Sequence, residues 1–206
     1  DIAVVKPNAT MYYTTTGKNL GGNGSSWTKV QKRVYVEDYG TELVVNGFLG
    51  LAPVSVIVED GTCKIPFGQL MDDHDYEEPY GFMHLVGCYI EGNKIGRDPN
   101  KEFLNGFVST DNSGAKVYEF YKTEYKEAWE DEDGKHDAGN YFIDDDPEYC
   151  RYYAVASNND ADGAAYSMGW CCNTWIECDA DPSGISNVKT TAKSTVKTYN
   201  LMGQEV

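Results

Sequence analysis

Four aromatic side chains stand in stretches of the sequence that are otherwise typical of polar loops. Trp27 follows the glycine- and serine-rich segment 21–26, and Trp129 precedes an acidic run. Tyr76 and Tyr80 lie on either side of a proline. A ring in a wet loop can stack on a sugar or hold a peptide, or it can fold back onto its own domain. Both interpretations stay open, and the candidate ligand-binding residues, for a glycan or a protein, are Trp27, Tyr76, Tyr80 and Trp129.

Three acidic segments contain residue types that could bind a metal ion. Residues 72–75 read Asp-Asp-His-Asp, and these side chains are ligands for several metals. Segments 158–163 and 179–184 match the opening of a calcium loop, but Gly169 and Thr190 stand where the closing glutamate belongs. Solvated turns explain all three segments more simply. We therefore expect no bound metal and no cofactor.

The sequence carries none of the motifs that mark common catalytic sites. A nucleophile elbow, a zinc-protease motif and a glycine-rich phosphate loop are all missing from its 206 residues. A glycan hydrolase needs two carboxylates about 5–10 Å apart, a distance that sequence cannot show. We expect a non-enzymatic domain. The alternatives are a hydrolase that uses an acidic pair and a purely structural surface module.

Composition narrows the possible partners. The chain has 17 Lys and Arg against 33 Asp and Glu, a formal net charge of −16. So acidic a surface repels phosphate backbones and anionic lipid, which argues against nucleic-acid binding. No apolar run is long enough for a membrane-spanning helix. The oligomeric state and the identity of the ligand stay open.

The clearest structural signal is a hairpin around Asp60-Gly61, a dipeptide typical of two-residue turns. If Glu59 pairs with Thr62 across the hairpin, six apolar residues lie on one face of it, because side chains alternate along strands. The predicted inward-facing residues are Val54, Val56, Val58, Cys63, Ile65 and Phe67.

A second hairpin is predicted from residues 151–157 and 165–172 around a turn-rich loop. Centring that loop places Cys150 opposite Cys171, at a separation that a disulfide tolerates. A slip of one residue would substitute Cys172, and Cys63 with Cys88 is a less supported second bridge. Reduced, buried thiols are the alternative.

Further strands are expected at 33–37, 42–48, 82–90, 103–110 and 117–121. Residues 122–129 read as a loop or a short helix, and 130–136 as an acidic loop. Many short strands joined by Gly, Asp and Asn turns indicate an all-β fold. We expect an antiparallel β-barrel of the lipocalin or calycin type, or a β-sandwich, with at most one short helix.

The composition changes near Asp181, which divides the chain into an antiparallel β-domain at 1–181 and a linker with a tail at 182–206. The tail ends Tyr-Asn-Leu-Met-Gly-Gln-Glu-Val over 199–206. It resembles the start of the C-terminal sorting segment of secreted Bacteroidetes proteins, the YNLxGQxV type. Residues 41–69 resemble uncharacterised secreted β-domains of the same bacteria. This resemblance implies an extracellular or outer-surface location after removal of a signal peptide, and it implies no enzymatic activity.

Overall fold

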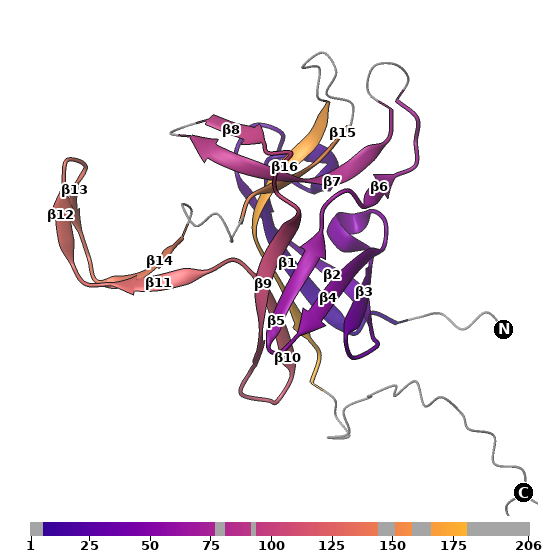
Figure 1. Ribbon diagram of the computed structural model, residues 1–206, viewed down its shortest axis with the longest axis horizontal. Helices are drawn as coiled ribbons and strands as arrows, with labels where there is room; N and C mark the ends of the chain where they lie inside the picture. The colour runs from indigo at the N-terminus through magenta and orange to yellow at the C-terminus, as the bar shows by residue number, and fades with distance from the viewer. Residues whose placement is uncertain (1–5, 77–80, 92–93, 144–150, 158–165, 181–206) are drawn as a thin grey trace, which may run out of the picture.

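Eight antiparallel strands close into a β-barrel in the computed structural model (Figure 1). The structure describes residues 6–76, 81–91, 94–143, 151–157 and 166–180. The predicted linker and tail at 182–206 therefore lie outside the described residues. In sheet order the barrel strands are β1 (Ala9–Thr15), β2 (Thr28–Asp38), β3 (Glu42–Asn46), β4 (Val54–Glu59), β5 (Thr62–Pro66), β9 (Phe103–Thr110), β10 (Lys116–Phe120) and β16 (Ser167–Cys178).

The barrel closes because β1 pairs with β2 on one side and with β16 on the other. Side chains alternate along each strand, so every second residue points into the barrel. Met11 and Tyr13 of β1 are buried, as is Ile176 of β16. The Tyr13 hydroxyl donates to the Leu20 carbonyl oxygen at 2.7 Å, which satisfies this polar group inside the core.

A second layer of strands crosses one end of the barrel (Figure 1). The first half of β16 pairs with β15 (Tyr153–Ser157), and β15 pairs with β7 (Met83–Glu91). Two short strands, β6 (Leu70–Asp72) and β8 (Lys94–Arg97), pair with β7. All of β15 is buried, because Tyr153 and Val155 join the barrel core while Ala154 and Ala156 join a smaller core beside it.

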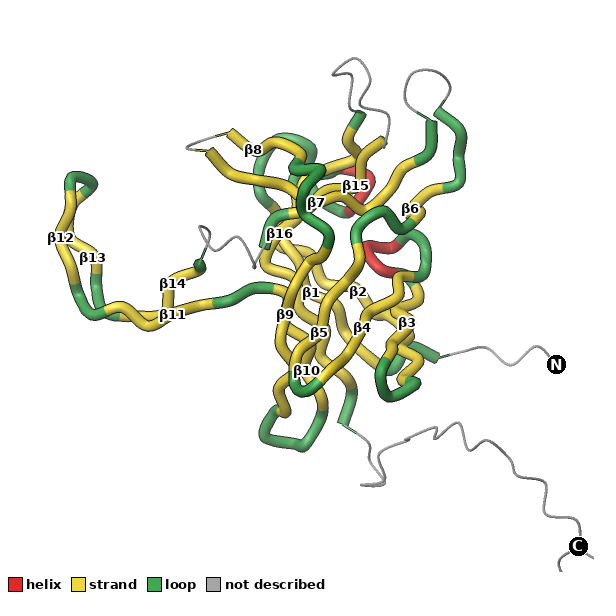
Figure 2. Tube along the Cα trace, in the orientation of Figure 1, coloured by secondary structure: helices red, strands yellow, loops and turns green. Residues whose placement is uncertain are grey.

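Two short helical turns are the helical segments of the described residues, shown in red in Figure 2. They are the 3-10 turns η1 (Lys18–Leu20) and η2 (Phe48–Gly50). Both bury apolar side chains: Leu20 from η1, and Phe48 and Leu49 from η2. The described part of the chain is thus all-β, as predicted, and it takes the barrel form rather than the sandwich.

A β-ribbon extends away from the barrel between β10 and β15 (Figure 1). β11 (Thr123–Lys126) pairs with β14 (Gly139–Phe142), and beyond them β12 (Trp129–Asp131) pairs with β13 (Gly134–His136). The prediction of a loop or short helix followed by an acidic loop is therefore wrong. Charged side chains on both faces of the ribbon hide the alternation that usually marks a strand.

The predicted Asp60-Gly61 hairpin is confirmed. Glu59 lies opposite Thr62 and Val58 opposite Cys63, in the predicted register. Asp60 and Gly61 both have positive φ angles, 46° and 78°, as a two-residue hairpin turn requires. Four of the six predicted inward residues are fully buried and the other two pack against the core: Val54, Val56, Cys63 and Ile65, then Val58 and Phe67.

The predicted register of the second hairpin is wrong by three residues. Tyr153 lies opposite Cys171, the position predicted for Cys150. Cys171 is a buried free thiol in the structure, and its Sγ lies 3.4 Å from Thr15 Oγ1. Burial raises the pKa of this thiol to about 12. Cys150 lies outside the described residues, and Cys63 is a free thiol in the barrel core.

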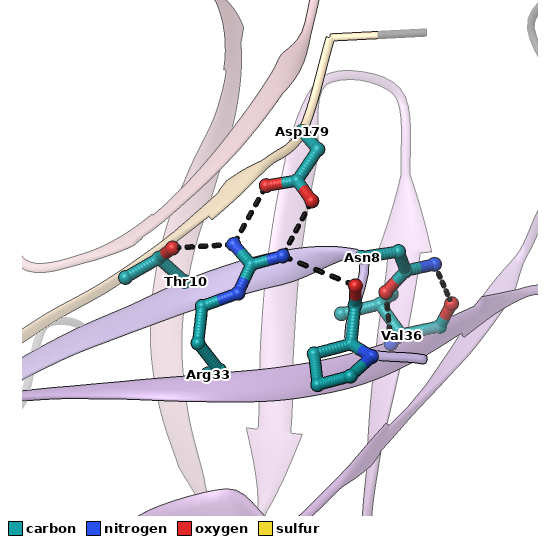
Figure 3. Close-up of polar contacts among 6 residues, drawn as sticks. Asn8, Thr10, Arg33, Val36 and Asp179 are labelled. Carbon is teal, nitrogen blue, oxygen red and sulfur yellow. Dashed lines mark hydrogen bonds and ion pairs between the residues drawn. The ribbon is translucent and has the colours of Figure 1, made fainter. Parts of the chain in front are cut away.

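A polar network fastens the barrel where β2, β1 and the end of β16 meet (Figure 3). The Arg33 guanidinium donates to both carboxylate oxygens of Asp179, at 2.7 and 2.5 Å. It also donates to Thr10 Oγ1 at 2.7 Å and to the Pro7 carbonyl oxygen at 3.1 Å. Beside it, the Asn8 side chain bonds both main-chain polar groups of Val36. These contacts join the first and last described segments of the barrel.

Candidate functional site

A groove of about 590 Å³ runs across the outer face of the barrel. β1, β2 and β16 form its floor, and Tyr121 and Phe142, which flank the base of the ribbon, form its side. We call it the outer groove, and its lining residues are Tyr12, Tyr13, Thr14, Lys29, Val30, Gln31, Tyr121, Phe142, Asn173 and Trp175.

Two stacked rings occupy the centre of the outer groove. Tyr12 lies between the inward-facing Met11 and Tyr13, so strand alternation turns its ring outward. Trp175 takes the same outward position on β16 and lies directly opposite Tyr12. The two rings are parallel within 10°, with centroids 4.7 Å apart. Cross-strand aromatic pairing therefore holds both rings in a defined orientation on the barrel surface.

The aromatic surface continues toward the ribbon. Tyr121 meets Trp175 edge to face at 6.3 Å between centroids, and Phe142 meets Tyr121 in the same way at 5.5 Å. The Arg151 guanidinium lies over the Phe142 ring at 4.1 Å and over the Tyr152 ring at 4.5 Å. Stacked, edge and cation–π contacts thus link residues from five separate segments into one surface.

A bulge at Asn173 shapes one end of the outer groove. The β1–β16 register shifts between Tyr12 and Thr14, and Asn173 has a φ of +50°, which asparagine tolerates better than most residues. Its side chain lines the groove. Arg151 Nη1 donates to Asn173 Oδ1 at 3.2 Å, so the guanidinium fixes the orientation of this amide.

Two carboxylates lie beside Trp175: Glu119 is opposite it on β10, and Glu177 is two residues further along β16. Trp175 Nε1 donates to Glu177 Oε1 at 3.0 Å, and the Tyr121 hydroxyl donates to Glu119 Oε1 at 3.2 Å. Burial, followed by the Glu119 charge, raises the pKa of Tyr121 to about 12. Burial and the Glu177 charge also raise the pKa of Tyr12. Both tyrosine hydroxyls therefore stay protonated at neutral pH and keep their ability to donate hydrogen bonds.

The structure does not gather the four predicted aromatic residues into one site. Trp27 is 41% exposed and meets Tyr152 edge to face at 6.0 Å, so it lies at the end of the aromatic surface described above. Trp129 is on the ribbon, where its ring stacks on His136 at 4.3 Å. Tyr76 donates to Asp72 Oδ2 at 2.8 Å and packs against the barrel core. Tyr80 lies outside the described residues.

Sequence reasoning missed Tyr12 and Trp175. The signal that could have identified them is an aromatic residue at the outward position of a strand whose neighbours are apolar and inward. Met11-Tyr12-Tyr13 fits that pattern, and Thr174-Trp175-Ile176 fits it except that its first inward residue, Thr174, is polar. Their pairing could not have been found in the same way, because it depends on which two strands close the barrel.

A second hollow of about 500 Å³ lies beside β5, β7 and the start of β9. Its charged lining residues include both signs, with Arg97 and Lys101 beside Asp98 and Glu102. Its floor is tightly packed, because a Cβ added at Gly87 would come within 2.5 Å of the Lys101 Cβ. We therefore take the outer groove, with its ordered rings, as the candidate site.

In the predicted acidic segments, the described residues Asp72 and Asp179 bind partners within the chain. Asp72 accepts from the His74 main-chain N–H at 2.9 Å and from the Tyr76 hydroxyl, and these bonds lower the pKa of its carboxyl. Asp179 is bound by Arg33, and segment 158–163 is outside the described residues. Within the described ranges, no group of three or more His, Cys, Asp or Glu side chains is placed to hold a metal ion.

Comparisons of the chain with protein-family models, with curated proteins and with solved structures found no match. Among the described residues, no helix has both the length and the apolar character needed to cross a membrane.

Proposed function

We propose that this protein is a secreted or cell-surface, non-enzymatic β-barrel that binds a glycan in the outer groove. The observation that carries the proposal is the ordered Tyr12–Trp175 ring pair in a groove that is also lined by the polar side chains of Lys29 and Gln31. Sugar rings have apolar faces that stack on aromatic side chains, and their hydroxyls need hydrogen-bond partners around the rim.

The order of side chains across the sheet indicates where the sugar ring would lie. Gln31, Tyr12 and Trp175 follow one another on three adjacent strands. One face of Tyr12 is covered by Trp175, so the opposite face is turned toward β2. Lys29, Gln31 and Asn173 then supply polar groups around that face. This combination of one ring face with amide and ammonium groups is suited to a single pyranose ring or a short oligosaccharide.

The secreted or cell-surface location is also part of the proposal. It rests on the resemblance of residues 199–206 to the start of the sorting segment of secreted Bacteroidetes proteins. A surface location would bring the groove into contact with extracellular glycans.

A glycan hydrolase remains the second candidate, and one observation favours it. Glu119 and Glu177 lie diagonally on the adjacent strands β10 and β16, beside Trp175. Diagonal neighbours in an antiparallel pair are about 7–8 Å apart along the sheet, which lets their carboxylates reach the separation of an acidic pair. In this alternative, cleavage of the glycosidic bond would depend on both carboxylates, one as general acid and the other as base or nucleophile.

The test is to screen the full chain against a glycan array and to measure the affinity of each hit by calorimetry. Trp175→Ala and Tyr12→Ala should each weaken binding about tenfold or more, as expected for central aromatic residues. Trp129→Ala is the matched control, because it removes the same side-chain type from the ribbon and should leave affinity unchanged. Thermal melts of all variants exclude loss of folding.

Three outcomes would contradict the proposal. The first is that the array yields no glycan ligand. The second is that Trp175→Ala binds as tightly as the wild type while Trp129→Ala does not. The third is shorter oligosaccharide products appearing with the wild type but not with Glu119→Gln, which would establish the hydrolase alternative instead.

A further inference from the structure

Positively charged side chains mark one end of the outer groove. Lys29 on β2 lies opposite Thr14 on β1, and Thr14 lies opposite Cys172 on β16. The next residue, Asn173, accepts a hydrogen bond from Arg151. Lys29 on β2 and Arg151 beside Asn173 of β16 therefore lie near the same end of the groove. With strands about 4.8 Å apart, β2 and β16 are separated by about 10 Å, enough to admit one sugar ring.

This end of the groove contrasts with the rest of the molecule. The whole chain has a net charge of −16, yet Lys29 is the one charged side chain among the described residues that line the outer groove. The nearby carboxylates, Glu119 and Glu177, lie beside Trp175 and accept bonds from Tyr121 and Trp175. Lys29 therefore gives this end of the groove a positive charge in a chain whose net charge is negative.

The Asn173 side-chain amide is a second hydrogen-bond donor near Lys29. Its Oδ1 accepts from Arg151, and Asn173 is one of the groove-lining residues, so the donors that this amide can offer a ligand are its Nδ2 hydrogens. The end of the groove that holds Lys29 thus presents N–H donors from an ammonium and from an oriented amide. Donors of this kind suit an anionic acceptor better than a hydroxyl, because charge-assisted hydrogen bonds are the stronger ones.

We propose that the outer groove is selective for carboxylated sugars, such as uronic or sialic acids. This inference rests on the proposed glycan-binding function and names its ligand class. The sugar ring stacks on Tyr12, while its carboxylate accepts hydrogen bonds from Lys29 Nζ and Asn173 Nδ2. Arg151 is a positioning residue, because it orients Asn173 and adds positive charge behind it.

The experiment measures the affinity of the full chain for matched ligand pairs by calorimetry. One pair is an oligogalacturonate and its methyl ester, and the other is sialyllactose and lactose. We expect the free acid of at least one pair to bind about tenfold more tightly than its neutral partner, the value of one charge-assisted hydrogen bond at a partly exposed site.

Two variants test whether Lys29 causes the preference for the acid. Lys29→Gln should remove most of the preference for the acid while it changes the affinity for the neutral partner little. Lys94→Gln, an exposed lysine on β8, is the matched control and should keep the full preference. The preference should also shrink as salt is raised from about 50 to 500 mM, because screening weakens exposed charge pairs.

The possible failures are distinguishable. Equal or tighter binding of the neutral partners would overturn the selectivity and leave the proposed glycan-binding function standing. An unchanged acid preference in Lys29→Gln would also overturn it. Failure of all four compounds, together with an array that yields no other glycan ligand, would contradict the proposed function and this inference with it.

Discussion

Gly106 of β9 lies close to the main chain of β10 at Glu119, and replacing it tests the geometry that places Tyr121 and Trp175 side by side. A Cβ at this position would lie 3.0 Å from the Glu119 carbonyl carbon and 3.1 Å from Cys63 Sγ, and closer still to the Glu119 carbonyl oxygen. Ordinary contacts begin at 3.4 Å. Because the obstructing atoms are main chain, they cannot rotate away, and the two strands must separate.

The expected cost follows from two opposing effects. Overpacking of this kind destabilises by about 1–3 kcal/mol, and the rigid obstruction favours the upper end. The lower entropy of the unfolded chain offsets about 0.4–1 kcal/mol. Gly106→Ala should therefore lose about 2 kcal/mol of unfolding free energy, which lowers the Tm of a domain of this size by about 4–8 °C.

Denaturant unfolding and calorimetry measure both quantities. Gly139→Ala is the control, because a Cβ there meets only the Tyr141 ring at an ordinary 3.8 Å. That variant should be as stable as the wild type or slightly more so. If Gly106→Ala unfolds within about 0.5 kcal/mol of the wild type, β9 and β10 do not approach as described, and the position of Tyr121 beside Trp175 has to be reconsidered.

Two further predictions concern stability. Val56→Asp places an unpaired charge at a site that is 0% exposed and should lower the free energy of unfolding, measured with denaturant, by several kcal/mol. Ser55→Asp, on the outward side of the same strand, should lower it far less, and an equal loss in the two variants would contradict the hairpin register. The Arg33 guanidinium lowers the pKa of the Asp179 carboxyl, so ionised Asp179 stabilises the fold above the ordinary carboxyl pKa of about 3.9, and this contribution disappears as the pH falls through the lowered value. Asp179→Asn should therefore flatten the acid limb of a plot of unfolding free energy against pH between about 2 and 6, and an unchanged acid limb would show that the ion pair contributes no stability.

The sequence predicted local structure well where a short turn fixed it. The Asp60-Gly61 turn leaves one register for its two strands, so the pairing of Val58 with Cys63 was predictable. The two strands of the second hairpin are separated by nine residues in the sequence, which leaves the register free. In addition, β16 changes neighbours near Asn173, from β15 to β10. No local sequence pattern indicates this change of neighbouring strand. The predicted register was therefore wrong by three residues.

The candidate site was less predictable than the fold. The sequence-based prediction favoured aromatic residues in loops. Of the predicted residues that the structure describes, only Trp27 lies next to the aromatic surface, where it contacts Tyr152. The central rings are on strands. Tyr12 and Trp175 are more than 160 residues apart in the chain. Their contact exists because the first and last strands of the barrel are neighbours, a long-range pairing that neither periodicity nor turn chemistry encodes.

The most direct test of the account is to follow the tryptophan side chains during ligand binding. The chain has four tryptophans, at 27, 129, 170 and 175, and therefore four indole N–H signals in a ¹⁵N-labelled sample. Titration with a bound glycan should shift the Trp175 signal most, because its ring lines the groove and its N–H donates to Glu177. The Trp129 signal, from the ribbon, should stay in place. A ligand that shifts Trp129 and leaves Trp175 unmoved would show that the binding site is not the outer groove.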